Sequence, residues 1–144
     1  MRRLKKALQL PPSELWVLAQ AAVYMPAVRL ALRFVSVARL NAMATRSRLP
    51  SATIDATPKD IARLVSIAAD HGIYQARCLE KSLVLRWLLA RRGIHAQLAF
   101  GAYKAEGAMQ AHAWVEIDGV PLNEDDGAHL DFARFEHLQT SENH

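Results

Sequence analysis

Three polar features of this chain have the types and the order that thiol chemistry needs. Cys78 is the single cysteine, His112 follows thirty-four residues later, and the acidic cluster Glu124-Asp125-Asp126 comes next. A thiol enzyme requires a nucleophilic sulfur, a histidine that accepts and returns a proton, and a polar group that orients that histidine. The signal is weak by itself, because a lone cysteine is often a small buried side chain. The competing hypotheses are a thiol enzyme and a non-catalytic binding module with an inert Cys78.

The residues around Cys78 predict that it begins a helix. A turn-like stretch that contains Gly72 precedes it, and an apolar run from Leu79 to Arg92 follows, before Gly93. Glycine after the last helical residue is a common C-terminal stop. The start of a helix presents unpaired backbone N–H groups and the positive end of the helix dipole, which favour negative charge on a nearby sulfur. This position is therefore a favourable one for a nucleophile.

His112 lies in a predicted strand over residues 111–117. Apolar side chains alternate there with His112, Trp114 and Glu116, which indicates a strand with one apolar and one polar side. We therefore expect these three side chains to share the polar side. The other histidines lie at a predicted helix end, on a strand with no acid nearby, or in the C-terminal tail.

Two carboxylates compete to orient His112. Asp118-Gly119 is a strong hairpin signal, so a return strand is expected after it. With a two-residue turn, counting outward places Asp125 opposite His112. With a three-residue turn, Glu124 becomes a neighbour of His112 on the same face. The residues alone leave both alternatives open.

The composition is that of an ordinary globular domain, with 144 residues of which 51% are apolar and 22% charged. A single cysteine excludes an intramolecular disulfide and an all-cysteine zinc site within one chain, and it fits a reducing compartment. We expect a cytoplasmic protein. We expect no metal and no cofactor, because Cys78, His112 and an acid show no short ligand-pair spacing.

The first 50 residues differ in charge from the rest. They hold nine Lys/Arg and one acid, a net charge of +8, whereas residues 51–144 hold nine Lys/Arg and thirteen acids, a net charge of −4. Such an asymmetry fits an anionic partner, a membrane surface or a solvated basic helix. The uncharged stretch between Glu14 and Arg29 has 14 residues. That is too short for an ordinary transmembrane helix, which needs about 20.

We predict two units along the chain. Residues 1–50 form a basic, apolar helical segment, and residues 51–144 form the domain that carries the candidate chemistry. In the first unit a helix begins after Ser13 as its N-cap, and Pro26 kinks or divides it. Residues 41–56 are rich in Ser, Thr, Ala and Arg, which is typical of a linker.

The second unit is predicted to be α+β. A clear helix start follows the linker, with an N-cap, a first-position proline and a first-turn acid: Thr57, Pro58 and Asp60. After Gly93 the apolar period changes from near 3.6 to 2, which predicts a strand over residues 94–102 and a glycine-containing loop over residues 104–110. The expected architecture is a helix that starts near Cys78 and packs on a small antiparallel sheet.

Three stretches together carry a family resemblance. Residues 77–83 are Arg-Cys-Leu-Glu-Lys-Ser-Leu, residues 91–94 are Arg-Arg-Gly-Ile, and residues 111–116 are Ala-His-Ala-Trp-Val-Glu. They resemble the Cys-Leu-x-x-Ser-Leu…Arg-Arg-Gly-Ile and His-Ala-Trp-Val-Glu patterns of the transglutaminase-like leader peptidases of lasso-peptide biosynthesis. The resemblance covers residues from about 55 to 135, and residues 10–50 look like the apolar N-terminal helical segment of these proteins.

The resemblance implies a papain-like cysteine protease, with a papain/transglutaminase-like core, that cuts the leader from a ribosomally made precursor. It implies that Cys78 is the nucleophile and His112 the general base. In the family an acid follows the histidine by about twelve positions, which here is Glu124. Asp125 stays the alternative from hairpin geometry.

The resemblance also implies partners. This short chain looks like the split form of the family, in which a small separate protein binds the leader and an ATP-dependent ring-closing synthetase acts alongside. The basic first 50 residues are candidates to dock either protein, and no nucleic acid is expected. An alternative within the thiol enzymes is a transglutaminase-like acyltransferase or amidase with the same three residues.

Overall fold

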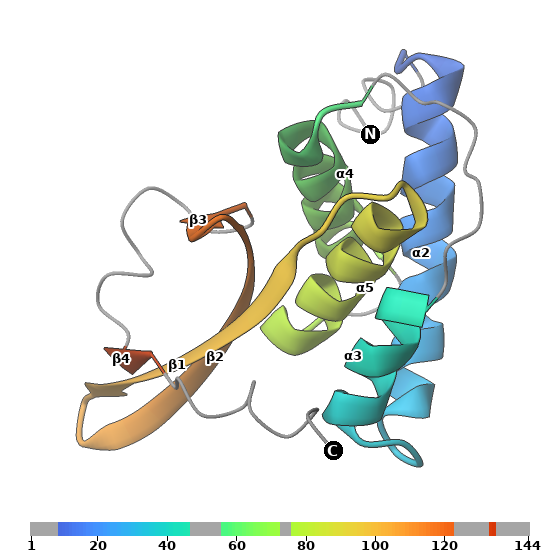
Figure 1. Cartoon of the computed structure of the whole chain (residues 1–144). Coiled ribbons are helices and arrows are strands. Elements are labelled where there is room, and N and C mark those ends of the chain that lie inside the picture. Colours follow the sequence, from blue (N-terminus) through green and yellow to red (C-terminus); the bar gives the residue numbers. More distant parts are fainter. Residues whose placement is uncertain (1–8, 47–55, 73–75, 123–132, 135–144) are drawn as a thin grey trace.

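The computed structural model describes residues 9–46, 56–72, 76–122 and 133–134. Helices come first and strands follow (Figure 1), so the predicted α+β class is confirmed. The helices are α2 (Pro12–Ala31), α3 (Val37–Arg46), α4 (Pro58–Asp70) and α5 (Cys78–Arg91). The strands are β1 (Gln97–Ala105), β2 (Ala108–Ile117), β3 (Val120–Pro121) and β4 (Ala133–Arg134).

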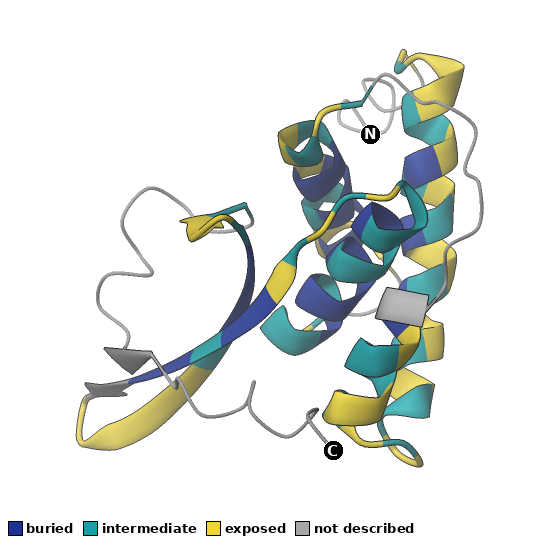
Figure 2. Ribbon diagram, viewed as in Figure 1, coloured by how far each residue is buried: buried dark blue, intermediate teal, exposed yellow. Residues whose placement is uncertain are grey.

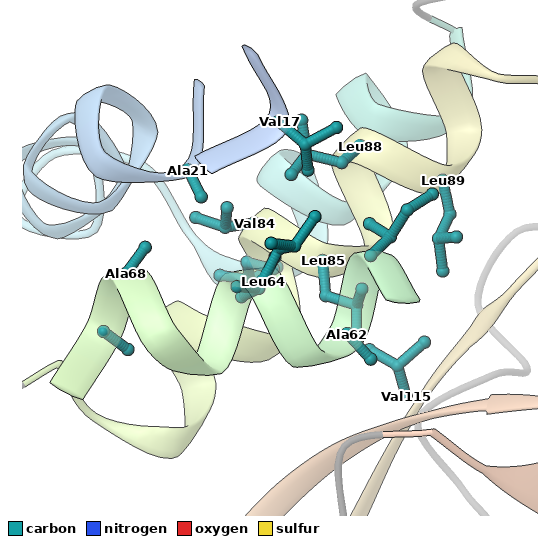
Figure 3. Close-up of a cluster of buried hydrophobic side chains, with 14 of the residues drawn as sticks. Val17, Ala21, Ala62, Leu64, Ala68, Val84, Leu85, Leu88, Leu89 and Val115 are labelled. Carbon is teal, nitrogen blue, oxygen red and sulfur yellow. The ribbon is translucent and has the colours of Figure 1, made fainter. Parts of the chain in front are cut away.

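One hydrophobic core joins three of these helices to the sheet. In Figure 3, Val17 and Ala21 of α2 lie beside Leu88 and Val84 of α5. Val115 of β2 belongs to the same cluster. The core is therefore built from the first 50 residues as well as from the later ones. The division at residue 50 stays a prediction from composition and charge.

α2 differs from its predicted form at two points. Its N-cap is Pro11, with Pro12 in the first turn, and Ser13 lies inside the helix. Pro26 lies within one continuous helix. The proline leaves the carbonyl of Ala22 without its intrahelical partner, but Ala22 and Pro26 are both exposed, so solvent can satisfy that oxygen.

The predicted linker is partly helical, because α3 extends to Arg46. The interpretation of residues 41–46 as linker is wrong, because these residues pack against a distant part of the chain. Arg86 of α5 donates from Nη1 to the carbonyl of Asn41, 2.6 Å away, and so holds the middle of α3 against α5. Among the described residues, no helix combines the length and the hydropathy that would span a bilayer.

The sheet is antiparallel, and its described strands have the order β3-β2-β1-β4. β1 and β2 continue to Ala105 and from Ala108, so the predicted loop over residues 104–110 is only a two-residue turn. Glu106 and Gly107 both have positive φ, 50° and 82°, as a type I′ turn requires. Glutamate rarely takes that first position, which is why the sequence pattern favoured a longer loop.

Two of the three side chains on the predicted polar side of β2 are buried, and the third, His112, is partly exposed. Trp114 is 2% exposed and Glu116 is 3% exposed, although the neighbours Ala113 and Val115 on the other face are buried as well. Figure 2 shows this burial as the dark later half of β2, toward β3. The alternation in the sequence thus predicted which side chains share a face of β2, but it did not predict that both faces are buried.

Candidate active site

Cys78 occupies the first helical position of α5, as predicted. Its side chain is partly buried and its thiol is free. Cys78 begins a stripe along α5 at spacings of four, three and four, which continues with Ser82, Leu85 and Leu89. Those three side chains are almost completely buried. Cys78 is therefore the accessible end of a stripe whose remaining members are packed in the interior.

The start of α5 is open to an anion. Its N-cap is Arg77, whose side chain has no acceptor atom, and no side-chain cap bond is formed there. The Glu80 carboxylate accepts from the backbone N–H of Arg77 at 3.1 Å and is itself only 4% exposed. Among the described side chains, none accepts from the first-turn N–H groups of α5. These groups can face a negatively charged oxygen beside Cys78.

His112 is held on β2 from two directions. Its backbone pairs with Gly101 of β1. Its ring stacks on Trp114, with centroids 6.1 Å apart and planes at 26°. The Trp114 indole in turn donates from Nε1 to Glu116 Oε1 at 2.8 Å, inside the protein. Trp114 thus links the His112 ring to the buried Glu116 carboxylate.

Ser82 joins the two halves of the site. Its hydroxyl donates to the carbonyl of Ala113, 3.1 Å away, and the bond is buried. Carbonyls of alternate residues in a strand point to the same edge. The carbonyl of Val115 accepts from the N–H of Leu122, on the β3 side. α5 therefore meets β2 at its β3 edge, one residue from His112.

A second contact gives the direction of α5 along β2. Arg86 donates from Nε to the carbonyl of Ala96, just before the stretch of β1 that pairs with Glu116. From Ser82 to Arg86 the helix thus advances in the direction of β2. Cys78 lies one turn before Ser82, about 6 Å back along the axis. The start of α5 therefore lies at the His112 end of the contact between α5 and β2.

The third member of the predicted site lies outside the described residues, since neither Glu124 nor Asp125 is among them. The turn before them is described. Ile117 pairs with Val120, so the hairpin has two turn residues, Asp118 and Gly119. This is the register for which the sequence predicts Asp125 opposite His112, and the assignment stays a prediction.

Sequence reasoning missed two contributions to the site. Ser82 appeared only as part of a motif, although its spacing of four from Cys78 places both on one helix face. The alternation His112-x-Trp114-x-Glu116 signalled a shared face but not a stacked and hydrogen-bonded column. Both contributions depend on contacts between elements or side chains that spacing alone does not specify.

No metal site accompanies these residues in the part of the chain that the structure describes, since no group of three His, Cys, Asp or Glu side chains there could hold an ion. His71 is exposed at the C-cap of α4, and His95 is exposed just before β1. The chemistry that the described residues support is nucleophilic attack by a thiol.

Comparison with known proteins gives one match. Residues 21–137 match the family model described as the transglutaminase-like superfamily. This range begins within α2, includes Cys78 and His112, and covers well over half of the chain. No curated protein and no solved structure matches the chain significantly.

Proposed function

Since this chain belongs to the transglutaminase-like superfamily, which includes cysteine peptidases and acyltransferases, we propose that it is a cysteine peptidase that removes the leader from a lasso-peptide precursor. One observation carries the proposal. Cys78 is partly exposed at the first position of α5, where no side chain caps the helix. This start of α5 lies at the His112 end of the contact between α5 and β2. The motifs around both residues support the leader-peptidase branch of the superfamily.

The proposed reaction is acyl transfer through a thioester. The Cys78 thiolate attacks the scissile carbonyl carbon, and the carbonyl oxygen becomes an oxyanion. The N–H of Cys78 donates to that oxyanion, and losing one such donor costs roughly 3–4 kcal/mol in comparable sites. Protonated His112 gives its proton to the leaving amine. His112 then takes a proton from water, which attacks the thioester, and the Cys78 thiolate leaves, so that the thiolate and protonated His112 are restored.

The proposal includes an acid that orients His112. The two-residue turn supports Asp125, and the spacing of the family motif supports Glu124. Asp125→Asn and Glu124→Gln, made separately, divide these alternatives. The variant of the true partner loses most of the cleavage rate, whereas the other keeps it.

We further propose that the peptidase acts in the cytoplasm with a small leader-binding protein and beside an ATP-dependent ring-closing synthetase. These partners follow from the resemblance of the motifs and from the +8 charge of the first 50 residues. The leader-binding protein would present the precursor, and the peptidase would supply the thiol.

The test is cleavage of a full-length precursor peptide by the whole chain, with the leader-binding protein added. Wild type is expected to release free leader, and Cys78→Ala is expected to release none. Cys78→Ser is the matched control, because serine preserves the size of the side chain at the helix start but is a far weaker nucleophile here. Full cleavage by Cys78→Ala would end the nucleophile assignment and favour a binding module.

A primary amine added to the same reaction separates hydrolysis from acyl transfer. Free leader in the presence of the amine supports the peptidase. A leader that carries the amine at its new C-terminus, in place of the free acid, supports the acyltransferase alternative. Mass spectrometry of the leader distinguishes the two products directly.

A further inference from the structure

One buried carboxylate near His112 has no part in the chemistry proposed above. Glu116 lies on β2, and the other buried carboxylate among the described residues, Glu80, lies in the first turn of α5. Burying a carboxylate is unfavourable unless hydrogen bonds hold it. Glu80 accepts from the backbone N–H of Arg77, whereas Glu116 accepts from the indole N–H of Trp114 at 2.8 Å. Glu116 is thus bonded to the residue that stacks on His112.

The strand register does not fix the His112 ring. His112 pairs with Gly101 of β1, and Trp114 pairs with Ala99. Directly opposed side chains in a sheet normally contact each other and limit each other's rotation. Glycine has no side chain, so the residue that pairs with His112 cannot hold the imidazole. The last torsion of a histidine side chain has a broad distribution, so the orientation of the ring depends on its other neighbours.

Trp114 is a neighbour on the same face whose own ring is fixed. Its side chain is buried, its ring centroid lies 6.1 Å from that of His112, and the two planes meet at 26°. Aromatic rings at this separation prefer a defined mutual orientation. The hydrogen bond from Nε1 to Glu116 fixes the rotation of the indole about its own last torsion. The contacts along β2 therefore run from Glu116 to Trp114 and from Trp114 to His112.

We propose that Glu116 is a positioning residue for His112 and that it acts through Trp114. By holding the indole, Glu116 keeps the imidazole in the orientation from which it exchanges a proton with the Cys78 thiol. Proton transfer and nucleophilic attack are sensitive to small errors in such geometry. In this role Glu116 needs no contact with the substrate, and the acid after the hairpin keeps its own proposed role. The inference rests on the proposed thiol chemistry and adds a residue to that site.

Two replacements of Glu116 test the acceptor. Glu116→Gln keeps an oxygen acceptor on a side chain of nearly the same size, whereas Glu116→Met keeps the length and removes the acceptor. In precursor cleavage by the full chain with the leader-binding protein added, Glu116→Met is expected to lower kcat about tenfold and to leave KM within about twofold. Glu116→Gln is expected to keep most of the wild-type kcat. A merely structural role would not confine the effect to kcat.

Leu98→Ala is the matched control for stability. Leu98 is buried and pairs with Val115, on the opposite face of the same two strands. This variant removes core contacts of β1 and β2 but leaves the residues that share a face with His112. Its kcat should equal that of wild type at a temperature well below its melting transition. Circular dichroism melting of every variant sets that temperature.

A double-mutant cycle tests the route through Trp114. Trp114→Phe keeps a ring for the stack and removes the indole N–H, so it should lower kcat about as much as Glu116→Met. If Glu116 acts through Trp114, the double variant loses no more kcat than the larger single loss. Losses that multiply in the double variant, a Glu116→Gln as slow as Glu116→Met, or wild-type kcat in Glu116→Met would overturn the proposal. If Glu116→Met does not fold, Trp114→Phe carries the test, and wild-type kcat in that variant would overturn it as well.

Alkylation of Cys78 by iodoacetamide separates this inference from the peptidase assignment. Cys78 is the single cysteine, so the reaction reports on one thiol, and its rate follows the fraction of thiolate that His112 supports. His112→Asn should slow alkylation most, Glu116→Met should slow it by about threefold or more, and Glu116→Gln should stay near wild type. If wild type leaves the precursor intact but this order holds, the peptidase assignment fails and the positioning role stands. Equal alkylation rates in Glu116→Met and wild type would overturn the positioning role, whatever happens to the precursor.

Discussion

The two helices that pack side by side in the core, α4 and α5, begin in opposite ways. At the start of α4 the Thr57 hydroxyl accepts from the N–H of Asp60 at 3.2 Å, and the Asp60 carboxylate accepts from the N–H of Thr57 at 3.1 Å. Pro58, in the first position, has no N–H to satisfy. The α4 start is therefore closed by its own residues.

At the start of α5 only half of this arrangement exists. Glu80 reaches back to the N–H of Arg77, as Asp60 does to Thr57, but Arg77 cannot accept a bond from the first turn. Cys78 stands where α4 has a proline. The start of α4 uses its backbone donors within the chain, whereas the start of α5, under the proposed function, leaves them for the substrate. The experiments below test that difference.

The largest loss of cleavage activity is expected from a change on β2, the strand that carries His112. His112→Asn removes the proposed general base and, under the proposed function, should lower kcat/KM for precursor cleavage by about a thousandfold. The fold should persist, since the backbone pairing of His112 with Gly101 does not require the imidazole. Steady-state cleavage assays measure the loss.

His95→Asn is the control for that variant, because His95 is an exposed histidine just before β1. It should cleave the precursor at the wild-type rate. Equal losses of kcat/KM in the two variants, or full activity of His112→Asn, would contradict a catalytic role of His112.

Adding an N-cap acceptor to α5 tests the difference between the two helix starts most directly. Arg77→Ser supplies the missing N-cap acceptor, so the protein should gain up to about 1 kcal/mol in the free energy of unfolding. The same bond occupies a first-turn donor beside Cys78, so kcat/KM should fall by about tenfold. Urea unfolding and cleavage assays on one preparation measure both quantities.

Thr57→Ala at α4 is the matched variant. It should lose about 1 kcal/mol of stability and keep its activity, because the α4 start takes no part in the chemistry. A more stable Arg77→Ser with undiminished activity would show that the open start of α5 has no role in catalysis.

The smallest effect concerns the pH dependence of the closed start. The side-chain bond to Thr57, then the backbone bond to Thr57, hold the pKa of Asp60 below its ordinary value of 3.8. The ionised carboxylate therefore stabilises the folded state above pH 3.8, and this contribution is lost as the pH falls through the lower folded-state pKa. Asp60→Asn should melt slightly below wild type at neutral pH, with a gap that narrows in acid.

Melting curves between neutral and acidic pH check this expectation. A gap that widens as the pH falls would contradict the assigned direction of the Asp60 pKa. Precursor cleavage near neutral pH should be the same in Asp60→Asn and wild type.

Local chemistry made several features predictable. The cap formed by Thr57 and Asp60 and the hairpin at Asp118-Gly119 each depend on residues within four positions of one another, although the sequence left the turn open between two and three residues and the structure decided for two. The stop at Gly93 is equally local: its φ is 72°, and the N–H of the next residue reaches the carbonyl of Leu89. The positions of Cys78 at a helix start and of His112 on a strand followed from such local signals.

The incorrect expectations have the opposite character. Residues 41–46 have the composition of a linker and become helical against α5, and the polar alternation of β2 ends in a buried Trp114 and Glu116. Each of these features depends on packing between helices and strands that are distant in the sequence. The spacing of side chains within one element does not specify that packing.

By itself the sequence determined that Cys78 stands at a helix start and His112 on a strand, because helix starts and strand parity follow from the backbone preferences of adjacent residues. Only the tertiary structure decided that Ser82 joins α5 to β2 beside His112, and that α2 packs one apolar side and exposes the other. The physical reason is that burial and hydrogen bonding between elements depend on the packing of the whole core. The sequence showed an apolar α2, and the structure shows that Trp16, Val23 and Leu30 of this helix are exposed.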